Sequence, residues 1–256
     1  MSMHHDPRTA RELYDHNASS WTRTAPSSLS DFTARPAVLE MCQPYAGVSV
    51  LDLGCGEGYC ARTMSDGGAA EVFGIDVSDR MIEAARHEEK RSPRGIRYEQ
   101  GDATDLQGIE DGSYDRVLAM FLFNYLNVEA TKRCMSEVAR VLRPGGRFVF
   151  AVPHPALPWL KQPVPPFYFD VGQSSYFAAR NTRWPGKIWK RDGSQLEVQL
   201  VHKTLEDYFD ALREAGFERL PLMKELRVTP EILQVDPKFF GPLGDTPLHL
   251  AVSVER

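Results

Sequence analysis

The sequence lacks the features that mark several specialised classes of protein. It has four cysteines in 256 residues. Their spacings match no zinc-binding pattern and include no C-x-x-C pair, so we expect reduced thiols and no bound metal. It has no apolar run of about 18 residues, the length that a membrane-spanning helix needs. The N-terminus lacks the basic and apolar regions of a secretory signal. These absences favour a cytoplasmic protein without a membrane partner.

The sequence also lacks a strong excess of charge. The formal net charge is -5, and no broad basic stretch suggests a nucleic-acid partner. The length and the 42% of hydrophobic residues fit one α/β domain of ordinary size. We therefore expect a small-molecule partner, and the sequence leaves the oligomeric state undefined.

A regular alternation of strands and helices is present in residues 48–152. Short apolar strands are predicted at 48–53, 71–75, 97–100, 114–121 and 147–152, with helices at 79–90 and 129–142. Strands that alternate with helices predict a parallel sheet with right-handed crossovers. This segment is therefore the predicted core of an α/β fold.

The remaining segments differ from this core in composition. Residues 1–47 are predicted to form an N-terminal helical cap. Residues 153–203 are rich in proline and aromatic residues and contain Asp192-Gly193, a hairpin signal between two short strands, so we interpret them as a lid inserted over the sheet. Residues 204–256 then supply a helix and two strands that complete the sheet as an antiparallel pair.

A glycine-rich turn follows the first predicted strand. Gly54, Gly56 and Gly58 let a ligand approach the backbone closely, and Asp52 at the end of the strand suits an ammonium group. A dinucleotide site is the alternative, because Gly56, Gly58 and Ala61 also fit the relaxed form of that fingerprint. The turn alone therefore indicates a nucleotide-like ligand of either kind.

Residues 51–58 resemble the first motif of the class I S-adenosylmethionine-dependent methyltransferases. Residues 74–78, 101–104 and 142–146 resemble later motifs in the same order, and the similarity covers 48–152 and 204 to the end. The resemblance implies a doubly wound, mostly parallel seven-stranded sheet of Rossmann-like type, with the last strand antiparallel. It also implies S-adenosylmethionine as the cofactor.

The resemblance implies roles for residues at the ends of the next strands. Asp76 would accept the ribose hydroxyls, with Val77 and Met81 following it in the same site. Asp102 would bind the adenine amino group, with Ala103 as a backbone contact. The alternative for Asp102 is an Asx-turn.

Aromatic and sulfur-containing side chains are predicted to flank the donor. Met120 and Phe121 follow the fourth strand, where ligands of open parallel sheets bind, although core packing would also explain them. Tyr14 and Trp21 lie in a segment that resembles the one that folds over the methionine half. An aromatic ring there would stabilise a sulfonium by cation–π attraction, whereas a plain amphipathic helix is the alternative.

The acceptor side is less well marked. His154, between two prolines after the fifth strand, is the leading candidate for a general base, and a structural histidine is the alternative. The lid carries many aromatic residues that favour an apolar or aromatic acceptor, or else form a small satellite core. The predicted lid residues are Trp159, Phe167, Tyr168, Phe169, Tyr176, Phe177 and Trp184.

Three functional hypotheses follow from these motifs. The first is a methyltransferase that modifies an O, N or C nucleophile of a small, apolar or aromatic molecule, such as a secondary metabolite. The second is a nicotinamide-dependent oxidoreductase that uses the same glycine-rich turn. The third is a methyltransferase-like protein that binds its ligand without catalysis.

Overall fold

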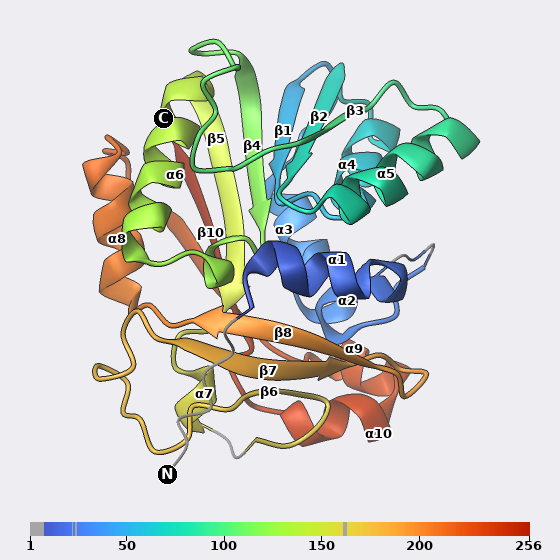
Figure 1. The fold of residues 1–256 in the computed structure, drawn as a ribbon, viewed down its shortest axis with the longest axis vertical. Coiled ribbons are helices and arrows are strands. Elements are labelled where there is room, and N and C mark those ends of the chain that lie inside the picture. The colour runs from blue at the N-terminus through green and yellow to red at the C-terminus, as the bar shows by residue number, and fades with distance from the viewer. Residues whose placement is uncertain (1–7, 22, 24, 161–162) are drawn as a thin grey trace.

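The computed structural model describes residues 8–21, 23, 25–160 and 163–256. Its core is a seven-stranded sheet in the order β3-β2-β1-β4-β5-β10-β9, in which β10 is antiparallel to both neighbours (Figure 1). The strands are β1 (Ser49–Leu53), β2 (Glu71–Asp76), β3 (Arg97–Gln100), β4 (Tyr114–Met120), β5 (Leu142–Pro153), β9 (Leu222–Leu226) and β10 (His249–Glu255). The sheet confirms the predicted doubly wound fold with its reversed last strand.

Helices cover both faces of this sheet. Successive strand residues face opposite sides, so Leu51 and Val117 pack with α6 and α8, whereas Val50 and Leu118 pack with α3, α4 and α5. Both faces are thus buried, which explains why the central strands are apolar throughout. The helices are α3 (Arg35–Met41), α4 (Tyr59–Asp66), α5 (Asp79–Arg91), α6 (Val128–Val141) and α8 (Leu205–Glu214).

Residues 143–146 differ from the prediction in one respect. They end helix α6 as expected, but they bulge out of β5 instead of forming a turn that precedes it. Leu142 pairs with Tyr114 and Arg147 already pairs with Arg116, so four residues loop out of the ladder. The bulge is held by the chain terminus, because the Gly145 amide donates to the Arg256 carbonyl (3.0 Å).

A second, three-stranded sheet forms from the predicted lid. Its strands are β6 (Phe167–Phe169), β7 (Arg183–Trp189) and β8 (Gln195–Val201), in antiparallel order. The predicted hairpin joins β7 to β8, with Gly193 in a left-handed conformation (φ 86°) that suits a glycine. Strand β6 was absent from the prediction.

The core of this second sheet draws on distant parts of the chain. Its buried cluster joins Phe169 and Leu196 to Trp21 near the N-terminus and to Phe240 and Leu243 near the C-terminus. The segments that pack there are α1 (Ala10–Trp21), α2 (Leu29–Thr33), α7 (Leu157–Leu160), α9 (Pro230–Val235), α10 (Pro237–Phe240) and the 3-10 turn η2 (Gly241–Leu243). The predicted limits of cap, lid and C-terminal unit stay predictions, but these units share one core.

Helix α1 lies between the two sheets. It crosses the carboxyl end of the core sheet and packs on α5 and β8 (Figure 1). The short turn η1 (Phe123–Tyr125), which follows β4, also contacts β8. Within the described residues, no helix is both long and apolar enough to cross a membrane.

The aromatic centre of the core gives the first prediction. Phe150 on β5 is fully buried, and its ring centroid lies 5.2 Å from those of both Phe123 and Phe148. Phe150→Ala should lower the free energy of unfolding by about 3–5 kcal/mol, because it removes apolar contacts and leaves a cavity. Urea denaturation would measure this. Leu220→Ala, at a side chain that is 95% exposed, is the control, and equal losses in both variants would contradict the packing described.

Candidate active site

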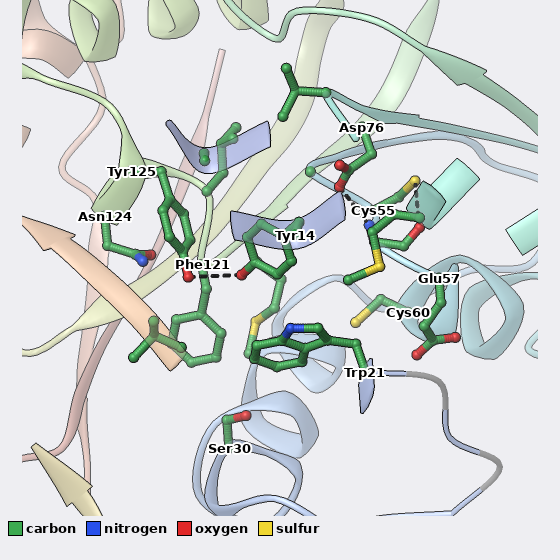
Figure 2. A pocket seen from close by; sticks show the side chains of 18 of the residues that line it. Tyr14, Trp21, Ser30, Cys55, Glu57, Cys60, Asp76, Phe121, Asn124 and Tyr125 are labelled. Carbon is green, nitrogen blue, oxygen red and sulfur yellow. Dashed lines mark hydrogen bonds between the residues drawn. The ribbon is translucent and has the colours of Figure 1, made fainter. Parts of the chain in front are cut away.

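A cavity of about 320 Å³ lies where the carboxyl ends of β1, β2 and β4 face α1 and the second sheet. The strand order changes direction between β1 and β4, which is where open α/β sheets bind ligands. Figure 2 shows Tyr14 and Trp21 in the middle of this cavity, with Asp76 on one side and Phe121 on the other. The cavity therefore reaches from the predicted donor residues to the predicted lid.

The glycine-rich turn forms one end of the cavity. Gly54 and Gly56 line it with positive φ angles of 68° and 56°. No described atom lies within 4 Å of the Cβ that a side chain at Gly56 would add, so the backbone is open to a ligand there. Gly58 does not line the cavity. Its φ is 85° and an added Cβ would lie 2.4 Å from the Tyr98 hydroxyl, so this glycine serves packing.

Asp52 is a buried carboxylate that faces this end of the cavity. Its side chain is 1% exposed, and neither oxygen makes a hydrogen bond of normal geometry within the described residues. Burial, with the Asp76 carboxylate nearby, raises the pKa of Asp52 to about 8, although the Ala61 amide opposes the shift. An unpaired buried carboxylate needs a cationic partner, which a ligand ammonium would supply.

Asp76 ends β2 beside the glycine-rich turn. Its two oxygens accept hydrogen bonds from the amides of Gly56 (2.8 Å) and Ser78 (2.9 Å), which fix the carboxylate plane. Burial raises the pKa of Asp76 to about 6, while these two amides oppose the shift. Each oxygen keeps a free lone pair, so the group can accept two further hydrogen bonds from a diol.

The next residues along this edge continue the cavity wall. Val77 and Met81 line it from the start of α5, and Asp102 and Ala103 line it after β3. The Asp102 carboxylate accepts from the Thr104 amide (2.8 Å), so the Asx-turn that competed with a ligand role is present. Because that turn uses one oxygen, the other stays available at the cavity.

The predicted aromatic residues of α1 close over the middle of the cavity. The rings of Tyr14 and Trp21 lie 5.4 Å apart, and the Tyr14 hydroxyl donates to the Tyr125 hydroxyl (2.8 Å) on η1. This bond joins the N-terminal helix to the segment after β4 (Figure 2). Met120 and Phe121 line the cavity beside it, and Phe121 has an unusual φ of 58°. A non-glycine residue in that conformation is typical of ligand sites.

The sequence prediction missed a buried group of charges near the glycine-rich turn. Arg23, Arg35 and Glu57 all line the cavity. The Arg35 Nη1 atom donates to Asp31 (2.7 Å) and to Ser30 (2.6 Å), and Arg23 lies 3.4 Å from Asp31. A signal for Arg35 existed, because its spacing to Val38 and Leu39 puts it on the apolar face of its helix.

Several predicted acceptor residues lie outside the cavity. Phe167 and Phe169 line it, but Tyr168 between them faces the other side and packs on Trp189 (5.8 Å) because side chains alternate along a strand. Trp159, Tyr176 and Trp184 do not line the cavity either. Trp159 and Tyr176 pack around His202, Trp184 lies in a small cluster against which Trp159 also packs, and Phe177 is 76% exposed. The satellite-core alternative describes these residues better.

His154 is also directed away from the cavity. Its Nε2 atom lies 3.0 Å from the Glu225 carboxylate on β9, and its Nδ1 atom accepts from the Ala156 amide (3.2 Å). A general base at this position stays a prediction without geometric support. Among the described histidines, His249 at the start of β10 lines the cavity, at a position that the sequence marked with no motif.

Comparison with known proteins gives the family. A family model described as a methyltransferase domain matches residues 50–146. The chain is 32% identical over 188 residues to the demethylmenaquinone methyltransferase of Lactococcus lactis, which covers 70% of this chain and 69% of that relative. The chain belongs to the class I S-adenosylmethionine-dependent methyltransferases. A solved structure described as an S-adenosylmethionine-dependent methyltransferase from Mesorhizobium loti is 25% identical, with a TM-score of 0.65 over 86% of this chain and 96% of the other.

A second curated relative of this methyltransferase is the demethylmenaquinone methyltransferase of Tropheryma whipplei. It is 36% identical over 170 residues, which is 64% of this chain and 66% of the relative. The chain spans about two thirds of the length of both relatives. Family membership confirms the predicted enzyme and its cofactor, S-adenosylmethionine, and leaves the nicotinamide hypothesis without support.

The cavity of this methyltransferase fits that cofactor. The unpaired Asp52 carboxylate matches an ammonium, and the open side of Gly56 leaves room for the ligand against the backbone. The lone pairs left on Asp76 match a ribose diol. All three features belong to the same cavity.

The buried Asp52 carboxylate predicts a pH dependence of stability. Its folded pKa of about 8 lies above the unfolded value of about 3.9. The folded state therefore holds the proton more tightly, and this stabilisation is lost as the pH rises through the folded pKa. Asp52→Asn lacks this titration. The urea midpoint of the variant, relative to that of the parent protein, should therefore rise between about pH 4 and pH 8. Parallel pH profiles for the two proteins would contradict this.

Proposed function

We propose that this methyltransferase moves the methyl group of S-adenosylmethionine onto an O, N or C nucleophile of a small, mainly apolar or aromatic molecule. One observation carries the proposal. The cavity that contains Asp52, Gly56 and Asp76 also reaches Phe167 and Phe169 on the second sheet. Donor groups and an apolar acceptor surface therefore share one cavity.

The donor residues are proposed from the wall that the cofactor fits. Asp52 pairs with the ammonium, which would favour its ionised form, and Arg35 supplies a cation for the carboxylate at the same end. Asp76 accepts the ribose hydroxyls, and Asp102 with Ala103 receives the adenine. Val77, Met81 and Met120 supply the apolar contacts between these polar groups.

Methyl transfer requires little covalent chemistry from the protein. When bound, S-adenosylmethionine supplies a methyl group that its sulfonium has already activated. The residues of this chain must hold the acceptor in line with that methyl and exclude water, and such positioning supplies roughly 7–11 kcal/mol. Tyr14, Trp21 and Phe121 surround the middle of the cavity, where their rings would also attract the sulfonium.

The acceptor class is supported by the chemistry of the far wall. Phe167 and Phe169 on β6, Ile188 on β7 and Val198 on β8 line it, so it suits an apolar or aromatic molecule. The names of the two curated relatives specify demethylmenaquinone, also a small molecule. For this chain we propose a small-molecule acceptor and do not propose demethylmenaquinone itself. A nucleic-acid acceptor is not part of the proposal.

Asp76→Ala tests the donor site. The variant should bind S-adenosylmethionine about 1–3 kcal/mol more weakly, because ribose hydroxyls lose their buried acceptor. Isothermal titration calorimetry measures the dissociation constant directly. Asp111→Ala is the control, since Asp111 is an exposed carboxylate that pairs with Arg140 and does not line the cavity. An unchanged dissociation constant in Asp76→Ala would refute the ribose role.

Methyl transfer itself is tested with isotopically labelled S-adenosylmethionine. We expect label to move to a member of a panel of apolar ring compounds that carry hydroxyl, amino or activated carbon nucleophiles. Release of S-adenosylhomocysteine should depend on the acceptor. Tight donor binding without transfer to any apolar ring compound would instead support the third hypothesis, a protein that binds without catalysis.

A further inference from the structure

His249 is a buried histidine with one uncommitted ring nitrogen. It is 2% exposed and stands at the start of β10, where its Cα pairs with Pro153 on β5 and with Leu226 on β9. Its Nε2 atom lies 3.1 Å from the Thr33 hydroxyl on α2. Its Nδ1 atom is buried without a hydrogen-bond partner in the described part of the chain. A buried polar atom without a partner is costly, so this one calls for a ligand.

The hydrogen bonds around Thr33 decide which ring nitrogen carries the proton. The Thr33 hydroxyl has one hydrogen, and it donates this hydrogen to the Leu29 carbonyl one helical turn back (2.9 Å). Thr33 can therefore only accept from His249, which requires a hydrogen on Nε2. In the neutral ring Nδ1 is then a bare lone pair, which is a hydrogen-bond acceptor and a base.

The surroundings of His249 are those of the acceptor wall. Its ring centroid lies 5.1 Å from that of Phe121 and 5.6 Å from that of Phe167, and all three residues line the cavity. Burial lowers the pKa of His249 to about 3, and the charges of Arg35 and His154 add to the shift. The ring is therefore neutral at ordinary pH and offers a lone pair among aromatic faces.

We propose that the Nδ1 atom of His249 binds a hydroxyl group of the methyl acceptor and takes its proton during transfer. The inference rests on the proposed function and narrows the acceptor to a hydroxylated aromatic compound. The acceptor oxygen forms a bond to the methyl carbon as the carbon–sulfur bond breaks, and the sulfur keeps that electron pair. The O–H bond breaks as well, and its proton passes to Nδ1, which later returns it to water.

A hydroxyl nucleophile suits a base as weak as His249. A hydroxyl oxygen becomes strongly acidic as it gains the methyl group, so even this ring can take the proton. The Nδ1 lone pair belongs to a ring that packs against aromatic side chains, so the site suits the hydroxyl of a phenol-like group.

The first experiment measures the tautomer without any ligand. The nitrogen-15 chemical shifts of His249, assigned by comparison with His249→Gln, should show a protonated Nε2 and an unprotonated Nδ1 near neutral pH. Thr33→Val should change the population of this tautomer, because the Nε2 hydrogen loses the hydroxyl that accepts it. A ring protonated on Nδ1 in the parent protein would overturn the proposal.

The second experiment compares two probes of the same shape, 2-naphthol and naphthalene, in the presence of S-adenosylhomocysteine. The parent protein should bind 2-naphthol about three- to tenfold more tightly, the value of one hydrogen bond to a neutral acceptor. On titration with 2-naphthol the Nδ1 shift should move and the Nε2 shift should stay. Equal affinity for the two probes, or binding of neither, would overturn the proposal.

Two variants separate a local role from a change of fold. His249→Gln can still reach toward Thr33 but lacks the Nδ1 atom, so it should lose the preference for 2-naphthol while its affinity for S-adenosylhomocysteine stays unchanged. His87→Gln, on the exposed face of α5, is the matched control and should keep the preference. Loss of the preference in His154→Gln and not in His249→Gln would overturn the assignment.

Titration with the donor distinguishes a failure of the proposed function from a failure of the role of His249. If the parent protein fails to bind S-adenosylhomocysteine and S-adenosylmethionine, the proposed function fails. If the donor binds and the hydroxyl preference is absent, the role of His249 fails alone.

Discussion

The chain leaves the neighbouring strands β1 and β4 in opposite directions, and the rest of the molecule depends on this arrangement. Because the order of strands reverses between these two neighbours, the segment after β1 runs to one side of the sheet and the segment after β4 to the other. Side chains cannot fill the space between them from the sheet itself. The glycine-rich turn, η1 and helix α1 all meet at this gap, and the second sheet covers it.

The two ends of the gap differ in chemistry because different elements supply them. The strand ends and the segment around α2 and α3 bring carboxylates and guanidinium groups, whereas the second sheet brings aromatic and aliphatic side chains. Charged groups are stable in such a buried place only when they pair, so the charges bond to one another or to backbone amides. Among the described residues that line the cavity, the Asp52 carboxylate and the Nδ1 atom of His249 lack such a partner, and ligand groups are expected at these two places.

The sequence predicted the core fold well because its signals there are local. Alternation of apolar strands with amphipathic helices depends on neighbours in the chain, and the motifs around Gly54, Asp76 and Asp102 follow directly from strand ends. All three motifs line the cavity at Gly54, Gly56, Asp76 and Asp102. The acceptor wall depends on which side of a short strand faces inward and on which distant segment covers it. For that reason Phe167 could not be told from Tyr168, nor His249 from His154, before the fold was known.

The mixed origin of the second sheet's core has a consequence for how the molecule assembles. Trp21, Phe169 and Phe240 pack in one cluster although most of the chain separates the first from the last. Contacts between such distant segments form late, because a long loop must close before they contribute. His249 belongs to the last strand of all. A growing chain therefore contains the residues of its donor wall before it contains β10, which the wall for the acceptor requires.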